Sequence, residues 1–200
     1  MRKVLSRNLD LTLILIAGYF LLAFVVRIVR SSALEIDETQ QALLSQHLLL
    51  GYGSQPFLYT WLQHGMNVLV GPSIASLSLL KNGLLFLCCL FFWLTARLLL
   101  RDRTLANIAT LGVLTMPTVF VMAQRDLTHT VLALSSVALF AYALFVTLKT
   151  PSISGYLLTG LAIGIGAIAK YNFVFVPLAA VVAIAMDKDL RPRLFDWRML

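Results

Sequence analysis

The residues best suited to chemistry form an acidic pair, Asp37-Glu38, which directly follows the first long apolar run of the chain. With Glu35, the pair places three of the nine acidic residues within four positions. A carboxylate can take a proton from an attacking hydroxyl group, so this stretch is the first candidate for acid–base chemistry. A structural role is also open. Asp37 can cap a short helix with Gln40 as its capping-box partner, and the helix dipole favours Glu38 in a first turn.

The composition places the protein in a membrane. Of its 200 residues, 60% are hydrophobic and only 12% are charged, whereas a soluble domain is about half apolar and a quarter charged. We attribute the net charge of +7 to cytoplasmic basic residues that set topology, and we expect no nucleic-acid partner. Cys88 and Cys89 are adjacent in an apolar run, and the three histidines share no ligand spacing, so no metal is expected.

The apolar runs predict an all-α, polytopic transmembrane helix bundle of about six spans, forming a single domain over residues 1–200. The first run, residues 9–29, is long enough to cross ~30 Å of hydrocarbon and is interpreted as an uncleaved signal anchor. Further spans are predicted at 74–99, 104–123 and 127–148. Residues 153–186 would make a helix of ~51 Å, too long for one span. Two short spans meeting at Lys170 are therefore predicted, with Gly160, Gly164 and Gly166 allowing close packing in the first of them.

Residues 31–73 form the predicted first external loop, with two amphipathic helices on the membrane surface. The first is expected to end at the Gly-Tyr-Gly sequence 51–53. The second is expected to begin after Gln55-Pro56 and to end at Gly71-Pro72. Tyr59 and Trp61 are aromatic residues of the kind that anchor a helix at the interface.

The positive-inside rule orients the bundle with a cytoplasmic N-terminus and a cytoplasmic segment at 187–200. All but five of the 16 basic residues then lie on the cytoplasmic side. The other five join the acidic residues on the outer face, where cations can hold the phosphate of a lipid-like substrate. The outer-face set comprises Arg27, Arg30, Lys81, Arg125, Lys170, Glu35, Asp37, Glu38, Asp126 and His129.

Three stretches resemble, in the same order, motifs of the family 39 type glycosyltransferases. Asp37-Glu38 followed by Gln55-Pro56-Phe57-Leu58-Tyr59-Thr60-Trp61-Leu62 and Gly71 resembles the first external loop of that family, with Gln55 in place of a proline. Residues 124–129 resemble the second external loop. The glycine-rich stretch 160–164 followed by Ala169-Lys170-Tyr171 resembles a glycine-rich span of the family.

The resemblance implies the GT-C fold of protein mannosyltransferases, aminoarabinose transferases and rhizobial galacturonosyltransferases. It implies transfer of a sugar from a polyprenyl-phosphate donor to a lipid, glycan or protein acceptor, without a metal or other cofactor. Asp37 would be the catalytic carboxylate, supported by Glu38, with Asp126 as a second acidic contact. Lys170 and Arg125 would contact the donor phosphate. His129, Tyr59 and Lys81 are further candidate substrate contacts, and the chain would be the N-terminal part of a longer transferase.

Two other functions fit parts of the sequence. A transporter or flippase for a lipid-linked intermediate would place ionisable residues near the midplane and carry repeated halves. This chain instead gathers its charges at one face and shows no obvious repeat, which favours an enzyme. A fragment that only binds lipid is the third alternative. At the residue level, Arg125-Asp126 could be a local ion pair and Lys170 a turn residue whose side chain extends to the interface.

Overall fold

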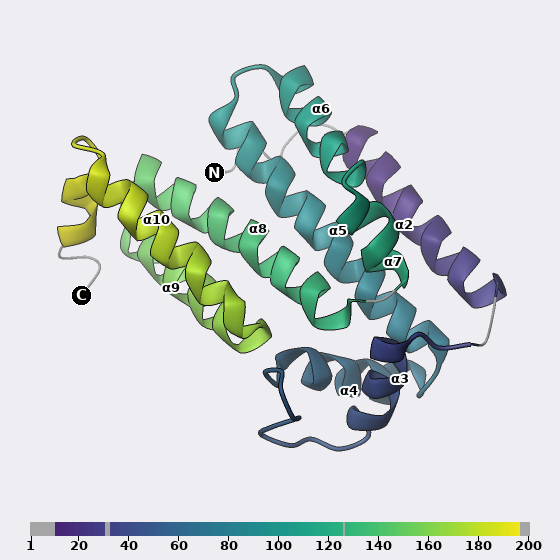
Figure 1. Cartoon of the computed structure of the whole chain (residues 1–200). Coiled ribbons are helices and arrows are strands. Elements are labelled where there is room, and N and C mark those ends of the chain that lie inside the picture. Colours follow the sequence, from purple (N-terminus) through teal and green to yellow (C-terminus); the bar gives the residue numbers. More distant parts are fainter. Residues whose placement is uncertain (1–10, 31–32, 126, 197–200) are drawn as a thin grey trace.

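The computed structural model of the chain describes residues 11–30, 33–125 and 127–196, and every regular element in these ranges is a helix (Figure 1). Three helices are long and apolar enough to cross a membrane, namely α2 (Leu11–Arg30), α5 (Ile74–Leu99) and α8 (Thr128–Lys149). Their bounds agree with the first, second and fourth predicted spans. The prediction of an all-α membrane helix bundle is therefore confirmed.

The bundle is built around α5, which packs between α2 on one side and α8 on the other (Figure 1). Ile16 and Phe20 of α2 meet Leu85 of α5 in the buried core, and Val131 of α8 joins them. Outside this contact, α2 keeps large apolar side chains such as Val29 exposed. In a bilayer this bare apolar surface would face lipid.

The third predicted span is interrupted near Pro117. Helix α6 (Arg103–Leu114) stops, and the chain resumes as the π-helical turn η1 (Thr118–Met122) and the short α7 (Ala123–Arg125). Proline has no N–H to donate and disfavours α-helix at the preceding residue, which accounts for the break. The prediction of one continuous helix over 104–123 is wrong in this respect, although the segment still runs beside α5.

The predicted break at Lys170 is confirmed, with a shorter apolar helix on either side of it. Helix α9 (Ile153–Ala169) ends at Lys170, and the chain turns through η2 (Tyr171–Val174) into α10 (Phe175–Met186). The two helices lie side by side in Figure 1, with the turn next to the beginning of α8. Helix α9 begins where the Ser152 hydroxyl accepts a hydrogen bond from the Gly155 N–H at 3.1 Å.

Of the three glycines predicted to allow close packing in this hairpin, Gly166 does so and the other two do not. A methyl group at Gly160 or Gly164 would meet nothing within 4 Å, so the Gly160–Gly164 contact is wrong. At Gly166 it would lie 2.2 Å from the ring of Phe173. Gly155 is the second tight position, because it lies against the Thr147 side chain of α8. The close approaches therefore lie on either side of the Gly160–Gly164 pair and not within it.

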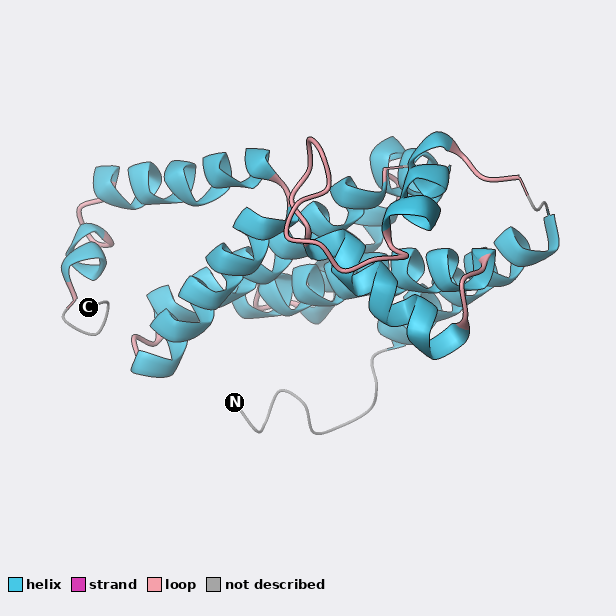
Figure 2. Cartoon of the chain, turned by 90° about the horizontal axis from the view of Figure 1, so that it is seen from below, coloured by secondary structure: helices cyan, strands magenta, loops and turns pink. Residues whose placement is uncertain are grey.

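The two helices predicted in the first loop are α3 (Ile36–Leu44) and α4 (Leu58–Val70), joined by the non-helical residues 45–57 (Figure 2). Helix α3 ends at Leu44, earlier than predicted, because the Ser45 hydroxyl bonds to the Gln41 carbonyl oxygen. Trp61 then donates to the Leu49 carbonyl at 2.8 Å and holds the connecting segment against α4. Both helices lie at one end of the bundle, beneath α5 and α8 in Figure 1.

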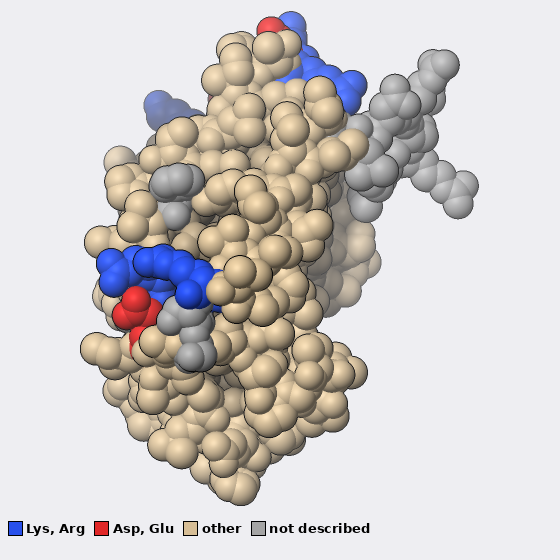
Figure 3. Space-filling view, turned by 90° about the vertical axis from the view of Figure 1, so that its right-hand side faces the viewer, with Lys and Arg blue, Asp and Glu red and all other residues tan. Residues whose placement is uncertain are grey.

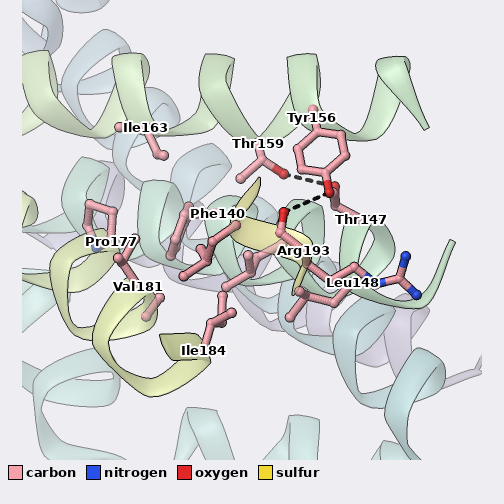
Figure 4. A pocket seen from close by; sticks show the side chains of 13 residues that line it. Phe140, Thr147, Leu148, Tyr156, Thr159, Ile163, Pro177, Val181, Ile184 and Arg193 are labelled. Carbon is pink, nitrogen blue, oxygen red and sulfur yellow. Dashed lines mark hydrogen bonds between the residues drawn. The ribbon is translucent and has the colours of Figure 1, made fainter. Parts of the chain in front are cut away.

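The segment after α10 folds back on the hairpin at the opposite end of the bundle. It forms η3 (Arg191–Phe195), where the Arg193 carbonyl accepts a hydrogen bond from the Tyr156 hydroxyl at 3.1 Å. An apolar cavity of about 90 Å³ lies between α8, α9 and α10 beside this contact (Figure 4). Its lining includes Phe140 and Ile184 but none of the predicted site residues.

Candidate functional site

Glu38 is a buried carboxylate that joins three helices. One oxygen accepts a hydrogen bond from Arg27 of α2 at 2.6 Å, and the other accepts one from Lys81 of α5 at 2.9 Å. Burial alone would raise the pKa of Glu38, but the hydrogen bond from Arg27 and the charge and hydrogen bond of Lys81 hold that pKa below its usual value. Glu38 is therefore ionised at neutral pH, and it fixes the first turn of α3 against the bundle.

The beginning of α3 is arranged differently from the capping prediction. Glu35 occupies the N-cap position, and its N–H donates to the Glu38 side chain at 3.3 Å. The capping box is thus Glu35 with Glu38, and the prediction of Asp37 with Gln40 is wrong. Asp37 lies one residue inside the helix, half-buried in the first turn. There a carboxylate is also stabilised by the helix dipole.

The charge of Asp37 acts on two aromatic side chains from other elements, Tyr59 of α4 and His129 of α8. Their rings are 5.4 Å apart. Tyr59 is fully buried rather than exposed as an interface anchor. Burial, reinforced by the charges of Glu38 and Asp37, raises the pKa of the Tyr59 hydroxyl, so the phenol keeps its proton. Among the described residues this hydroxyl has no hydrogen-bond partner.

Gln41 connects the acidic turn to α8. The side-chain nitrogen of Gln41 lies 3.0 Å from Nε2 of His129. The side-chain oxygen of Gln41 accepts a hydrogen bond from the Thr60 hydroxyl at 3.1 Å. Because an amide N–H donates, Nε2 of His129 accepts, and the neutral ring then carries its proton on Nδ1. Gln41 thereby orients His129 toward the same turn that carries Asp37.

The candidate cations are divided between two edges of this region. Lys170, at the turn between α9 and η2, donates to the Thr130 hydroxyl at 2.7 Å and lies on the α8 edge. Arg125 pairs with Glu35 at 3.3 Å on the α2 edge, where both side chains are exposed. The structure does not place these two residues in one contact. Lys81 lies under Glu38, almost inaccessible, and Asp126 lies outside the described residues.

A polar network fixes α4 to α5 and to the end of α3. Gln63 donates to Ser76 and to Asn67, each at 3.0 Å. Asn67 in turn donates to the Ser45 hydroxyl at 2.9 Å. The Ser73 hydroxyl caps α5 by accepting from the Ser76 N–H. The loop helices are therefore fixed to the bundle by hydrogen bonds, which gives Asp37 a rigid support.

Comparison with known proteins identifies the family. The family model described as dolichyl-phosphate-mannose-protein mannosyltransferase matches residues 54–198. The chain belongs to this family.

Two curated relatives from Rhizobium johnstonii extend the match to nearly the whole chain. The lipopolysaccharide core galacturonosyltransferase RgtB is 48% identical over 193 residues, or 96% of this chain, and RgtA is 47% identical over 195 residues, or 98%. The chain spans 39% of the length of each relative. No solved structure matches. The family membership confirms the resemblance found in the sequence.

Three residues of the candidate site were not singled out by the sequence analysis, namely Gln41, Thr60 and Thr130. Gln41 could have been found, because it lies one helical turn after Asp37 on the same face of α3. Thr60 and Thr130 gave no signal of their own. Arg27, which the sequence analysis placed in the outer-face set, is an ion-pair partner of Glu38. No group of three His, Cys, Asp or Glu side chains suited to a metal lies within the described ranges.

Proposed function

We propose that this chain carries the catalytic carboxylate of a membrane glycosyltransferase that transfers a sugar from a polyprenyl-phosphate donor to a lipid or glycan acceptor. The observation that carries the proposal is the 48% identity to a lipopolysaccharide core galacturonosyltransferase across 96% of the chain. A uronic sugar as the transferred group and a lipopolysaccharide core as the acceptor class follow from that relative. The reaction would take place at the periplasmic face of a bacterial inner membrane, where the sorting of basic residues puts the acidic turn.

Asp37 is the proposed general base. The acceptor hydroxyl attacks the anomeric carbon of the donor sugar and its proton passes to the Asp37 carboxylate, while the bond from that carbon to the phosphate oxygen breaks. The electron pair leaves with the carrier phosphate, which needs little acid assistance. Lys170 is the proposed cation at the departing phosphate, because it lies on the α8 edge beside His129.

The neighbouring residues act on Asp37 through its helix. Glu38 cannot serve as a second base in this arrangement, since both of its oxygens accept hydrogen bonds from cations. It is a positioning residue that holds the first turn of α3. Asp126 remains a proposed second acidic contact, and His129 a proposed substrate contact held by Gln41.

The decisive variant is Asp37→Asn in the native protein expressed in membranes. Removing a general base costs about 10²- to 10⁴-fold in rate, so transfer should fall by at least two orders of magnitude. The measurement is transfer of galacturonosyl from a lipid-linked donor to lipopolysaccharide core. Asp189→Asn, at the opposite end of the bundle, is the matched control and should retain full transfer. An Asp37→Asn protein that inserts normally and transfers at the wild-type rate would overturn the assignment.

A further inference from the structure

A polar hollow lies where the end of α2 meets the beginning of α3 and α7. It has a volume of about 260 Å³ and is lined by Arg27, Arg30, Ala33, Leu34, Glu35, Gln124 and Arg125. Figure 3 shows basic side chains gathered with an acidic one on this side of the molecule. Asp37, His129 and Lys170 do not line the hollow, so it is separate from the proposed catalytic residues.

The lining carries more positive than negative charge. Among the described lining residues, three guanidinium groups face a single carboxylate, that of Glu35, because Glu38 is buried behind Arg27 and does not reach the hollow. Arg125 keeps most of its side chain exposed although it pairs with Glu35. Planar guanidinium groups suit the oxygens of a phosphate, so the hollow favours a phosphate-bearing ligand.

An apolar hollow adjoins the charged one. It has a volume of about 340 Å³ and is lined by Val121, Met122 and Leu127 together with Glu35 and Arg125, the two residues it shares with the first hollow. Val121 and Met122 belong to η1 and are exposed, as is Val29 near the end of α2. A charged head site and an apolar tail site are therefore continuous on a side of the bundle where α2 offers bare apolar surface.

We propose that these two hollows bind an anionic glycerophospholipid of the surrounding membrane. Its phosphate pairs with Arg30 and Arg125, and an acyl chain lies along Val121 and Met122. A soluble phosphate would leave the apolar hollow unfilled. A sugar donor would need its anomeric carbon near Asp37, which lies outside both hollows. The bound lipid links the end of α2 to α7, and so supports the seam at which Arg27 reaches Glu38.

The test is lipid binding by the purified protein in neutral detergent, with bound lipids counted by native mass spectrometry. Phosphatidylglycerol should bind more tightly than phosphatidylcholine. Arg30→Gln and Arg125→Gln should each weaken phosphatidylglycerol binding about fivefold, the effect of one basic residue near a lipid surface. Met122→Asp should weaken it through the tail site. Arg101→Gln, an exposed arginine just beyond α5 at the other end of the bundle, is the control and should bind like wild type.

Inorganic phosphate and polyprenyl phosphate are the competing ligands. Equal binding of the two phospholipids, or wild-type binding by both arginine variants, would overturn the proposal. So would displacement of phosphatidylglycerol by inorganic phosphate or by a stoichiometric amount of polyprenyl phosphate. Folding of each variant is checked by thermal denaturation, in which unfolding exposes the buried Cys88 and Cys89 to a thiol-reactive dye. Sugar transfer is not measured, so this proposal and the proposed enzymatic function stand or fall separately.

Discussion

At the residue scale, Glu38 is a buried ion-pair residue that supports the turn carrying Asp37, the proposed general base. Its side chain is 2% exposed, as is that of Lys81, and Arg27 covers the remaining oxygen. Taking such charges out of water is costly, and their mutual attraction offsets the cost only while all partners are present. Removing one member therefore leaves buried charges without compensation. The acidic turn that carries Asp37 depends on this cluster being complete.

We predict that Glu38→Gln lowers the free energy of unfolding by about 3–5 kcal/mol, because Lys81 and Arg27 lose their buried counter-charge. The control is Glu35→Gln, which breaks the exposed pair with Arg125 and should cost at most about 1 kcal/mol. The measurement is the denaturation midpoint of the purified protein, followed by thiol reactivity of Cys88 and Cys89. Equal effects of the two substitutions would contradict the claim that Glu38 is the buried support.

The sequence identified the acidic pair but not the partners of Glu38. Asp37 and Glu38 stand out because they are adjacent and follow a long apolar run. Lys81 lies 43 residues further along the chain, and a lone lysine in an apolar run gives no indication of its counter-ion. Because its counter-ion was not identified, Lys81 was predicted to be a substrate contact. Tyr59 was placed at the interface for a similar reason, since periodicity within one helix does not report what another helix covers.

At the element scale, helix beginnings and ends were predictable where local chemistry sets them. Helix α4 ends at Gly71, whose φ of 85° is favourable only for glycine, and the next helix begins at the Ser73 cap. Lys170 was found because the run 153–186 is too long for one span. Helix α3 ended seven residues before the predicted glycine, because Ser45 bonds into a network with α4 that no local pattern reveals.

The prediction at the scale of helices concerns Gly166, where α9 packs against the turn that follows it. Gly166→Ala would place a methyl group against the buried ring of Phe173, so the hairpin that presents Lys170 must shift. Overpacking of this kind costs about 1–3 kcal/mol. Gly164→Ala is the matched control in the same helix, where the added methyl group meets open space and alanine favours helix. We expect a lower melting temperature for the first variant and no loss for the second. A lower melting temperature for Gly164→Ala than for Gly166→Ala would show that the Gly160–Gly164 pair governs packing.

At the scale of the whole molecule, the helices sort the charged residues to two ends. One end holds Glu38, Lys81 and Lys170, with the loop helices α3 and α4 packed against it. At the other end, Lys149 donates to the Leu98 carbonyl, so the end of α8 meets the end of α5. The topology predicted from the basic residues places successive loops on alternate faces of the membrane. It requires two charged ends, because each span must return the chain to the opposite face.

This sorting yields a topology that can be measured. Leu50, in the connecting segment between α3 and α4, and Lys188, after α10, are both exposed and lie at opposite ends of the bundle. With the acidic turn outside, a membrane-impermeant maleimide should label Leu50→Cys in intact spheroplasts and Lys188→Cys only after permeabilisation. Cys88 and Cys89 are buried, so the unsubstituted protein provides a low background. Labelling of both positions from outside would contradict the predicted topology of six crossings. Labelling of Lys188→Cys alone would put Asp37 in the cytoplasm, away from the proposed periplasmic donor.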